Sequence, residues 1–147
     1  MQISQYTDYA LRILIALALQ PEKRVKLHDI ADAYGISYNH LVKVVGALHH
    51  RGLVLPRRGR NGGLMLDRDP AEINVGYVVR EFESSMDLLE CFDAETNSCP
   101  IAPLCPATGI FFEARAAFLA VLDRYSLADV IAERADGMRM LLGVPPV

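Results

Sequence analysis

Apolar residues recur at helical spacing near the start of the chain. They place one broad face of a predicted helix at Ala10, Leu11, Ile13, Leu14 and Leu17. Ser4 or Thr7 can cap this helix, because each offers a short polar side chain near its first turn. The pattern carries the helix to about Leu19, and Pro21 stops it.

Residues 27–50 predict two further helices separated by a glycine turn. Leu27, Ile30 and Ala31 mark a short helix, Gly35 can adopt a positive φ in the turn, and Ser37 can cap the second helix. The apolar face of that second helix is formed by Leu41, Val44, Val45 and Leu48. Helix, tight turn, helix is the layout of a helix-turn-helix, although αα-corners of the same form are common in helical proteins. In a helix-turn-helix, the residues that reach the DNA major groove would be Ser37, Tyr38, Asn39, His40 and Lys43.

The next stretch predicts a β-hairpin. Apolar residues at 53–55 and 64–66 flank a tip rich in arginine and glycine. A hairpin directly after a recognition helix is typical of a winged helix, and arginines at its tip suit contacts with phosphates or a narrow minor groove. The tip residues expected to contact DNA are Arg57, Arg58, Arg60, Asn61 and Gly62. A loop that merely promotes solubility is the weaker interpretation, because these arginines have no acidic neighbour.

Charge is distributed unevenly along the chain, and this favours the DNA interpretation. The 147 residues carry a net charge of −3, but residues 1–70 carry 10 Lys/Arg and 6 Asp/Glu, whereas residues 71–147 carry 5 and 12. No acidic residue lies between Asp32 and Asp67. A one-signed interval of this length indicates a polyanionic partner.

The acidic half predicts more helix. A helix should follow Pro70, with apolar positions from Ile73 to Phe82, and a long amphipathic helix should span residues 107–125. A capping box at residues 126–129 should open a last short helix. The apolar stripe of the long helix lies outside the winged helix and needs a cover. A second copy of the chain is the simplest cover, and packing against its own domain is the alternative.

All three cysteines lie between these helices, at Cys91, Cys99 and Cys105. Their spacing matches neither a zinc finger nor a ferredoxin. Zinc held by three cysteines and an aspartate or water remains an alternative, as a zinc module or enzyme. Three thiolates can also hold three irons of a [4Fe–4S] cluster and leave the fourth iron to a replaceable ligand. The start of the chain lacks a secretory signal and no apolar run could span a bilayer, so we expect a cytoplasmic protein with reduced thiols and no membrane partner.

The chain resembles the iron–sulfur winged-helix transcription regulators, the family that includes IscR and the nitric-oxide sensor NsrR. The resemblance covers nearly the whole sequence, through "YTDYALRIL", "IADAYGISYNHLVKVVGAL", "GRNGGLML", "TNSCPIAPLC" and "FLAVLDRYSLADV". The last two stretches look most like the NsrR branch. The resemblance implies a homodimeric transcriptional repressor, not an enzyme, that binds a double-stranded and palindromic DNA operator and responds to nitric oxide. A regulator of the same family that senses redox state or iron–sulfur status is the alternative.

Carried over residue by residue, the resemblance implies that Cys91, Cys99 and Cys105 hold a [4Fe–4S] cluster, or alternatively a [2Fe–2S] cluster. It also implies that Asp8, donated from the partner subunit, is the fourth ligand. The expected fold is mainly α: a winged helix-turn-helix DNA-binding region over residues 1–70, a connecting helix and cluster loop over 71–106, and a dimerisation helix with a C-terminal helix over 107–147.

Overall fold

The structure, a computed structural model, describes residues 2–57, 59 and 62–144. It is mainly helical, with one antiparallel hairpin, as the sequence predicts. The elements in chain order are α1 (Gln5–Ala18), α2 (Leu27–Tyr34), α3 (Tyr38–His50), β1 (Val54–Arg57), β2 (Gly63–Leu66), α4 (Val75–Phe82), α5 (Pro106–Leu122), α6 (Leu127–Ile131) and α7 (Ala135–Leu141).

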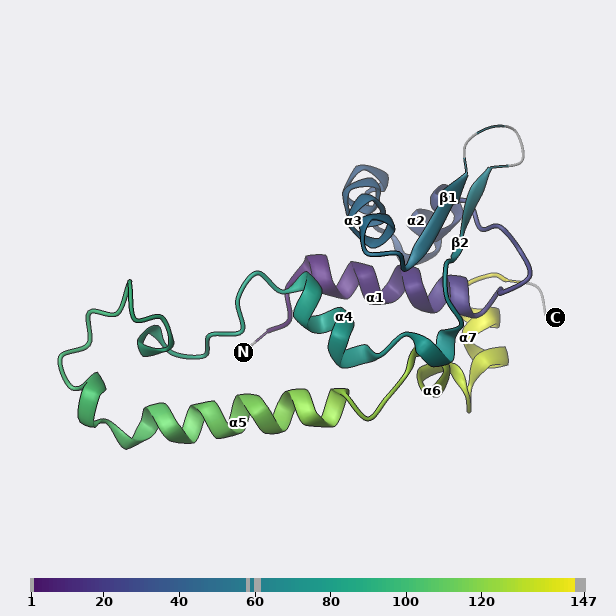
Figure 1. Cartoon of the computed structure of the whole chain (residues 1–147). Helices are drawn as coiled ribbons and strands as arrows, with labels where there is room; N and C mark the ends of the chain where they lie inside the picture. The colour runs from purple at the N-terminus through teal and green to yellow at the C-terminus, as the bar shows by residue number, and fades with distance from the viewer. Residues whose placement is uncertain (1, 58, 60–61, 145–147) are drawn as a thin grey trace.

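Helix α1 is the centre of the molecule (Figure 1). Helices α2 and α3 and the hairpin lie on one side of it, and α4 and then α5 lie on the other. Its apolar face is buried at Ala10, Ile13, Leu14 and Leu17, and the hydroxyl of Ser4 accepts the capping hydrogen bond from the backbone N–H of Thr7. The predicted first helix and its apolar face are therefore confirmed.

The glycine turn between α2 and α3 forms as expected. Gly35 ends α2 with φ 63°, a left-handed conformation that favours glycine, and Ile36 packs against the core. The expectation for Ser37 is only half met. It occupies the N-cap position of α3, but among the described residues its side chain makes no capping hydrogen bond. Ser37 is exposed to solvent.

Strands β1 and β2 form the predicted wing in the register Val54 with Leu66 and Arg57 with Gly63. Val25 adds a bridge on the open side of β2, through hydrogen bonds of 2.9 and 2.8 Å with Leu64. The hairpin is thereby fixed to the segment that joins α1 to α2. Arg58, Arg60 and Asn61, three of the predicted tip residues, lie outside the described residues.

A compact joint connects α4 to the far end of α5. Arg80 donates to both carboxylate oxygens of Asp123 at 2.6 and 2.5 Å, and the side-chain amide of Asn74 donates to the Asp123 carbonyl at 2.8 Å. Away from this joint α5 packs little, and although all of its residues are described, none is buried. The helix starts and ends within a few residues of the predicted bounds.

The C-terminal segment returns to the DNA-binding region. The predicted capping box is present in α6, where Ser126 and Asp129 cap each other, and Leu127 is buried in the core. The expectation of a single last helix was wrong, because α7 follows. Arg139 of α7 donates to the carbonyl of Leu19 at 2.8 Å. These residues are far apart in the chain, and no local sequence pattern predicts their contact.

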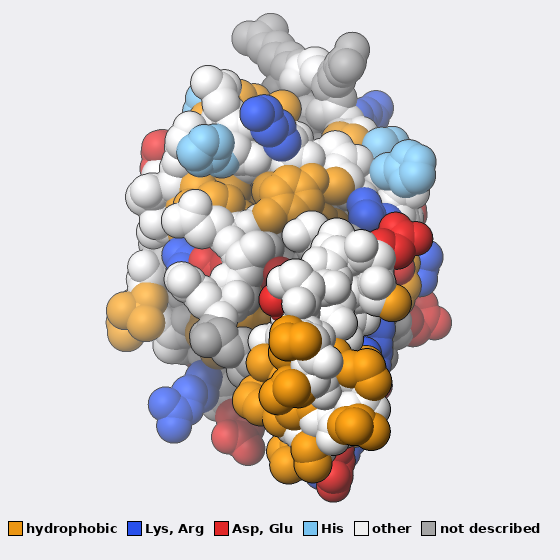
Figure 2. Space-filling model, turned by 90° about the vertical axis from the view of Figure 1, so that its left-hand side faces the viewer, with side chains coloured by type: hydrophobic (Ala, Val, Ile, Leu, Met, Phe, Trp, Pro, Cys, Tyr) orange, Lys and Arg blue, Asp and Glu red, His pale blue; other side chains and the backbone are white. Residues whose placement is uncertain are grey.

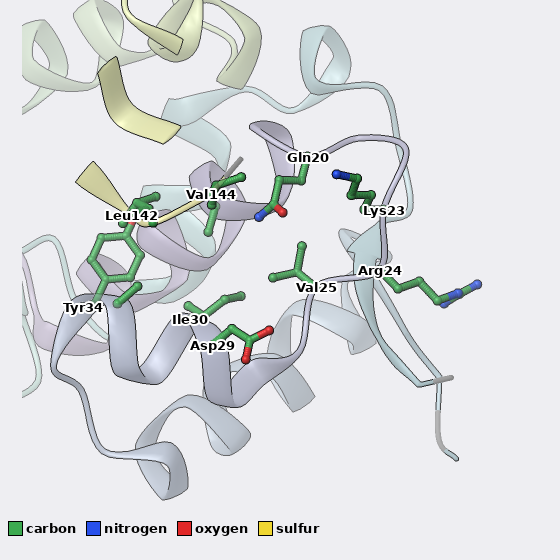
Figure 3. Close-up of a pocket in the computed structure, with 12 residues that line it drawn as sticks. Gln20, Lys23, Arg24, Val25, Asp29, Ile30, Tyr34, Leu142 and Val144 are labelled. Atoms are coloured by element: carbon green, nitrogen blue, oxygen red, sulfur yellow. The ribbon is translucent and has the colours of Figure 1, made fainter. Parts of the chain in front are cut away.

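A pocket of about 220 Å³ lies between the end of α1, helix α2 and the C-terminal segment (Figure 3). Val25, Ile30 and Leu142 contribute apolar lining, while Arg24 points away from it. In the part of the chain that the structure describes, no buried side-chain nitrogen or oxygen lacks a hydrogen-bond partner. The pocket therefore presents no unpaired buried polar group for a ligand.

Candidate nucleic-acid interface and cysteine loop

The first turns of α3 present a polar face to solvent. Tyr38, Asn39, His40 and Lys43 are exposed, while Leu41 between them is fully buried. This alternation fixes the helix by its apolar face and leaves the opposite face available to a partner. α3 and the strands of the wing lie on the same side of α1 (Figure 1).

The ring of Tyr38 stacks on His28 of α2. The ring centroids are 4.0 Å apart and the planes differ by 9°. His28 is exposed and was not among the residues predicted to contact DNA. Its position on the preceding helix, ten residues earlier, gave no periodic signal that it would meet Tyr38. The contact ties the first turn of the candidate recognition helix to α2.

The wing contributes Arg57 and Gly62 to this surface. Arg57 is exposed at the end of β1, and the N–H of Gly62 donates to the carbonyl of Gly59 at 2.8 Å in the turn. Arg51, at the C-terminal end of α3, forms an ion pair with Glu81 at 3.0 Å. Its guanidinium carbon also lies 4.8 Å from the ring centroid of Phe82. Arg51 therefore connects α3 to α4.

The loop between α4 and α5 carries the three cysteines at the end of the molecule away from the wing (Figure 1). Cys91, Cys99 and Cys105 are all half-buried free thiols. Cys91 Sγ lies 3.3 Å from Thr108 Oγ1, and the N–H of Cys99 donates to Asn97 Oδ1 at 3.0 Å. Two 3-10 turns, Glu90–Phe92 and Ala102–Leu104, are the helical pieces of this loop, in keeping with the prediction that it is not regular helix.

Hydrogen bonds within the loop stabilise its acidic side chains in their charged form. Glu90 accepts from the hydroxyl and the N–H of Ser98, at 2.6 and 2.8 Å, and these bonds lower the pKa of Glu90. Asp93 accepts from the N–H of Glu95 and the hydroxyl of Thr96, and its pKa is lowered in the same way. Both carboxylates are therefore occupied as acceptors inside the loop.

The donor set suits a soft metal centre, because three free thiols on one loop can become three thiolate ligands. The loop geometry does not yet form such a centre. Across residues 2–57, 59 and 62–144, no three His, Cys, Asp or Glu side chains converge in a way that could hold a metal ion. The thiols fit the chemistry of an iron–sulfur cluster.

Asp8 lies on α1 and not in the cysteine loop. Its carboxylate forms an ion pair with Arg12 at 2.8 Å, and both side chains are about 40% exposed, at 42% and 39%. The Arg12 guanidinium lies over the ring of Tyr34, 5.5 Å from its centroid. Asp8 and Arg12 line an open groove whose other wall includes Gly35 and Ile36 of the helix-turn-helix. Asp8 is thus accessible and adjacent to the DNA-binding turn.

The sequence of this winged helix matches the Rrf2 family, described as iron-dependent transcriptional regulators, over residues 3–133. The chain belongs to the Rrf2 family. Relatives named HTH-type transcriptional regulator NsrR are similar over almost the full length. The protein from Shouchella clausii is 46% identical over 143 residues, covering 97% of this chain and 95% of the relative, and that from Geobacillus kaustophilus is 48% identical over 143 residues, covering 97% of each.

Solved Rrf2-type structures share the fold. IscR of T. potens superposes with a TM-score of 0.74 at 25% identity, covering 93% of this chain and 90% of that one. CymR, the global cysteine regulator of B. subtilis, gives 0.71 at 29% identity, covering 90% and 97%. The expected family and mainly helical winged-helix class are confirmed. The Rrf2 chain is a transcriptional regulator and not an enzyme.

Within the described ranges of this Rrf2 chain, we find no helix with both the length and the apolar character needed to cross a bilayer.

Proposed function

We propose that this Rrf2 regulator is a cytoplasmic transcriptional repressor whose binding to its operator is controlled by an iron–sulfur cluster that reacts with nitric oxide. The observation that carries the proposal is the grouping of three free thiols on one loop of a winged-helix regulator. The name NsrR, carried by relatives that match nearly the full length, supports the assignment to nitric oxide.

The operator contacts are assigned to the surface that α3 and the wing share. Ser37, Tyr38, Asn39, His40 and Lys43 would meet base edges and phosphates in a major groove. Arg57 and Gly62, with the arginines and asparagine of the undescribed tip, would meet the adjacent backbone or minor groove. Tyr38 enters this contact already oriented by its stack on His28.

A homodimer would explain why α5 exposes large apolar side chains. This helix has no buried side chain among its 17 described residues, and Ile110, Phe111 and Val121 are exposed at 64%, 40% and 45%. Seen from the end that carries the cysteine loop, hydrophobic side chains gather over the projecting part of the molecule (Figure 2). Pairing this face with a second copy would bury it and would place two winged helices on a palindromic operator.

The residues that would hold a [4Fe–4S] cluster, or alternatively a [2Fe–2S] cluster, are Cys91, Cys99 and Cys105, with Asp8 of the partner subunit. When bound, such a cluster supplies iron atoms with which nitric oxide reacts. A carboxylate suits the fourth position because it is a harder and more easily displaced ligand for iron than a thiolate.

Asp8 links ligand state to DNA binding through its surroundings. When its carboxylate is not a ligand, it pairs with Arg12, which lies over Tyr34 at the end of α2. When it is engaged elsewhere, that ion pair is lost and Arg12 is released beside the helix-turn-helix. The two states therefore differ at the turn that orients α3. A hundredfold change in operator affinity needs a coupling free energy of only about 2.7 kcal/mol.

The test begins with anaerobic purification of the full-length chain. Absorbance in the thiolate-to-iron charge-transfer region and analysis of iron and sulfide should show a cluster. Binding to a candidate operator duplex, followed by fluorescence anisotropy, should weaken as nitric oxide is added. Cys99→Ala should abolish the cluster and its control of DNA binding. Colourless protein that binds the duplex equally well with and without nitric oxide would refute the proposal, and one zinc without sulfide would favour the zinc alternative.

A further inference from the structure

One stripe of α5 contacts the cysteine loop. Thr108, Phe112 and Arg115 are spaced four and three residues apart, so they lie on a single face of the helix. All three contact residues of the loop. This stripe is distinct from the exposed apolar positions Ile110 and Val121 that we assign to the dimer.

The central contact is a ring stack. Phe92, the residue after Cys91, lies parallel to Phe112, with the centroids 3.9 Å apart and the planes inclined by 3°. Parallel rings at this distance restrict both the position and the orientation of the backbone that carries them. The backbone of residue 92 is therefore fixed against the second turn of α5.

Arg115 covers both rings and also holds the start of the loop. Its guanidinium carbon lies 4.8 Å from the Phe92 ring centroid and 4.9 Å from that of Phe112. Its Nη1 donates to Asp87 Oδ1 at 3.2 Å and to the Met86 carbonyl at 3.5 Å. One side chain thus fixes both ends of segment 86–92, and Thr108 meets Cys91 Sγ between them.

The remainder of the loop makes different contacts. The side-chain hydrogen bonds of residues 93–99 run within the loop, from Glu95 and Thr96 to Asp93, from Ser98 to Glu90, and from Cys99 to Asn97. The loop consequently has one segment, 86–92, that is anchored to α5. A second segment, 93–99, is held within the loop, in part by the two hydrogen bonds of Ser98 to Glu90 of the anchored segment.

We propose that Phe112 and Arg115 are positioning residues for the cysteine loop: they clamp residues 86–92 onto α5 and so fix the position of Cys91. The functional meaning of the clamp rests on the proposed role of these cysteines as ligands. The clamp itself does not depend on that role. It makes α5, the proposed dimer helix, the element that positions the first part of the cysteine loop.

The rate of cleavage by glutamyl endopeptidase can report whether the clamp is open, because the chain has glutamates both inside and outside the clamped segment. Glu90 lies within the clamped segment, Glu95 lies beyond it, and Glu22 is exposed in the segment after α1 and serves as an internal reference. In the full-length protein, Phe112→Ala and Arg115→Ala should each accelerate cleavage after Glu90 about tenfold, which corresponds to about 1.4 kcal/mol in the opening equilibrium. Cleavage after Glu22 should not change.

Two controls separate the clamp from other effects. Met140→Ala removes an exposed apolar side chain from α7, outside the clamp, the proposed dimer face and the proposed DNA-binding surface, and should leave the ratio of cleavage after Glu90 to cleavage after Glu22 unchanged. Phe112→Tyr keeps the ring and should behave like the parent chain. Phe92→Ala removes both the stack on Phe112 and the contact with Arg115, so the double variant Phe92→Ala/Phe112→Ala should be cleaved no faster than Phe92→Ala alone. An unchanged Glu90 ratio in both clamp variants, or additive effects in the double variant, overturns the proposal.

A second readout relates the clamp to the proposed function. In anaerobically prepared protein, the clamp variants should lose bound iron to a chelator several-fold faster than the parent chain and than Met140→Ala. If the parent chain holds no iron and sulfide, the proposed function fails while the cleavage ratios still report the clamp. If the parent chain holds a cluster and the variants neither open nor lose iron faster, the clamp alone fails.

Discussion

A methyl group added at Gly76 would probe the joint between α4 and α5. Gly76 is buried, and a Cβ there would overlap the carboxylate of Asp123 and lie 3.1 Å from a guanidinium nitrogen of Arg80. Arg80 and Asp123 are the two members of the ion pair that fixes the end of α5. Gly76→Ala should therefore displace Asp123 and loosen the joint.

Two opposing effects set the size of the change. Overpacking of a buried position costs about 1–3 kcal/mol, whereas alanine in place of glycine inside a helix contributes about 1 kcal/mol of stability. The net effect of Gly76→Ala should be a loss of about 1 kcal/mol in the free energy of unfolding. If Asp123 is first replaced by alanine, the overlap disappears and only the helical preference remains. In that background the same Gly76→Ala change should stabilise the protein by up to about 1 kcal/mol.

The assay is a double-mutant cycle on Gly76→Ala and Asp123→Ala, followed by thermal unfolding at one fixed protein concentration. For a chain of this length, each kcal/mol corresponds to roughly 3 °C in Tm. The expected signature is a change of sign: Gly76→Ala lowers Tm in the parent chain and raises it in the Asp123→Ala chain. Equal shifts of Tm in both backgrounds would show that Gly76 and Asp123 do not meet.

Three further predictions address the core, the pH dependence and DNA binding. Leu127→Ala removes a side chain that is 1% exposed and should cost about 2–4 kcal/mol in denaturant unfolding, whereas a change below about 1 kcal/mol would place this residue outside the core. Burial alone would raise the pKa of Glu83, but hydrogen bonds from Thr7 and Ser4 outweigh it and lower the pKa below its ordinary 4.5. The charged form of Glu83 therefore stabilises the fold above pH 4.5. The parent chain should be more stable than Glu83→Gln at that pH, and the difference in unfolding free energy should disappear as the pH falls through the lowered pKa. Unfolding curves of both proteins across that pH range check this. Lys43→Ala should weaken operator binding similarly for all duplexes and reduce the slope of log K against log salt by about 1, and loss of sequence preference instead would assign Lys43 to a base.

Features that depend on residues close together in the chain could be predicted from the sequence. The turn at Gly35 follows from the conformational freedom of glycine, and the reciprocal cap of Ser126 and Asp129 follows from their spacing. The apolar faces of α1 and α3 follow from helical periodicity. In each case the partners are neighbours in the chain, so a local pattern suffices.

Contacts between distant residues could not be predicted in this way. His28 meets Tyr38 only because the angle between α2 and α3 brings their rings together, and Arg139 reaches Leu19 from the other end of the chain. Arg115 was also missed, because the loop-facing stripe of α5 mixes a hydroxyl, a ring and a cation and gives no clear apolar period. The cysteines themselves were evident from the sequence, but the clamp that fixes the loop beside Cys91 was not.

The positions of the core residues along the chain also determine the order in which parts of the protein can fold. Of the described residues that form the buried core, all but Leu127 lie at or before Phe82. Because a chain folds from its N-terminal part onward as it leaves the ribosome, the winged-helix region can assemble nearly all of its interior before α5 has fully emerged. Leu127 is then the late addition that completes the core. The three cysteines thus emerge between the last residues of the DNA-binding region and the residue that completes its core.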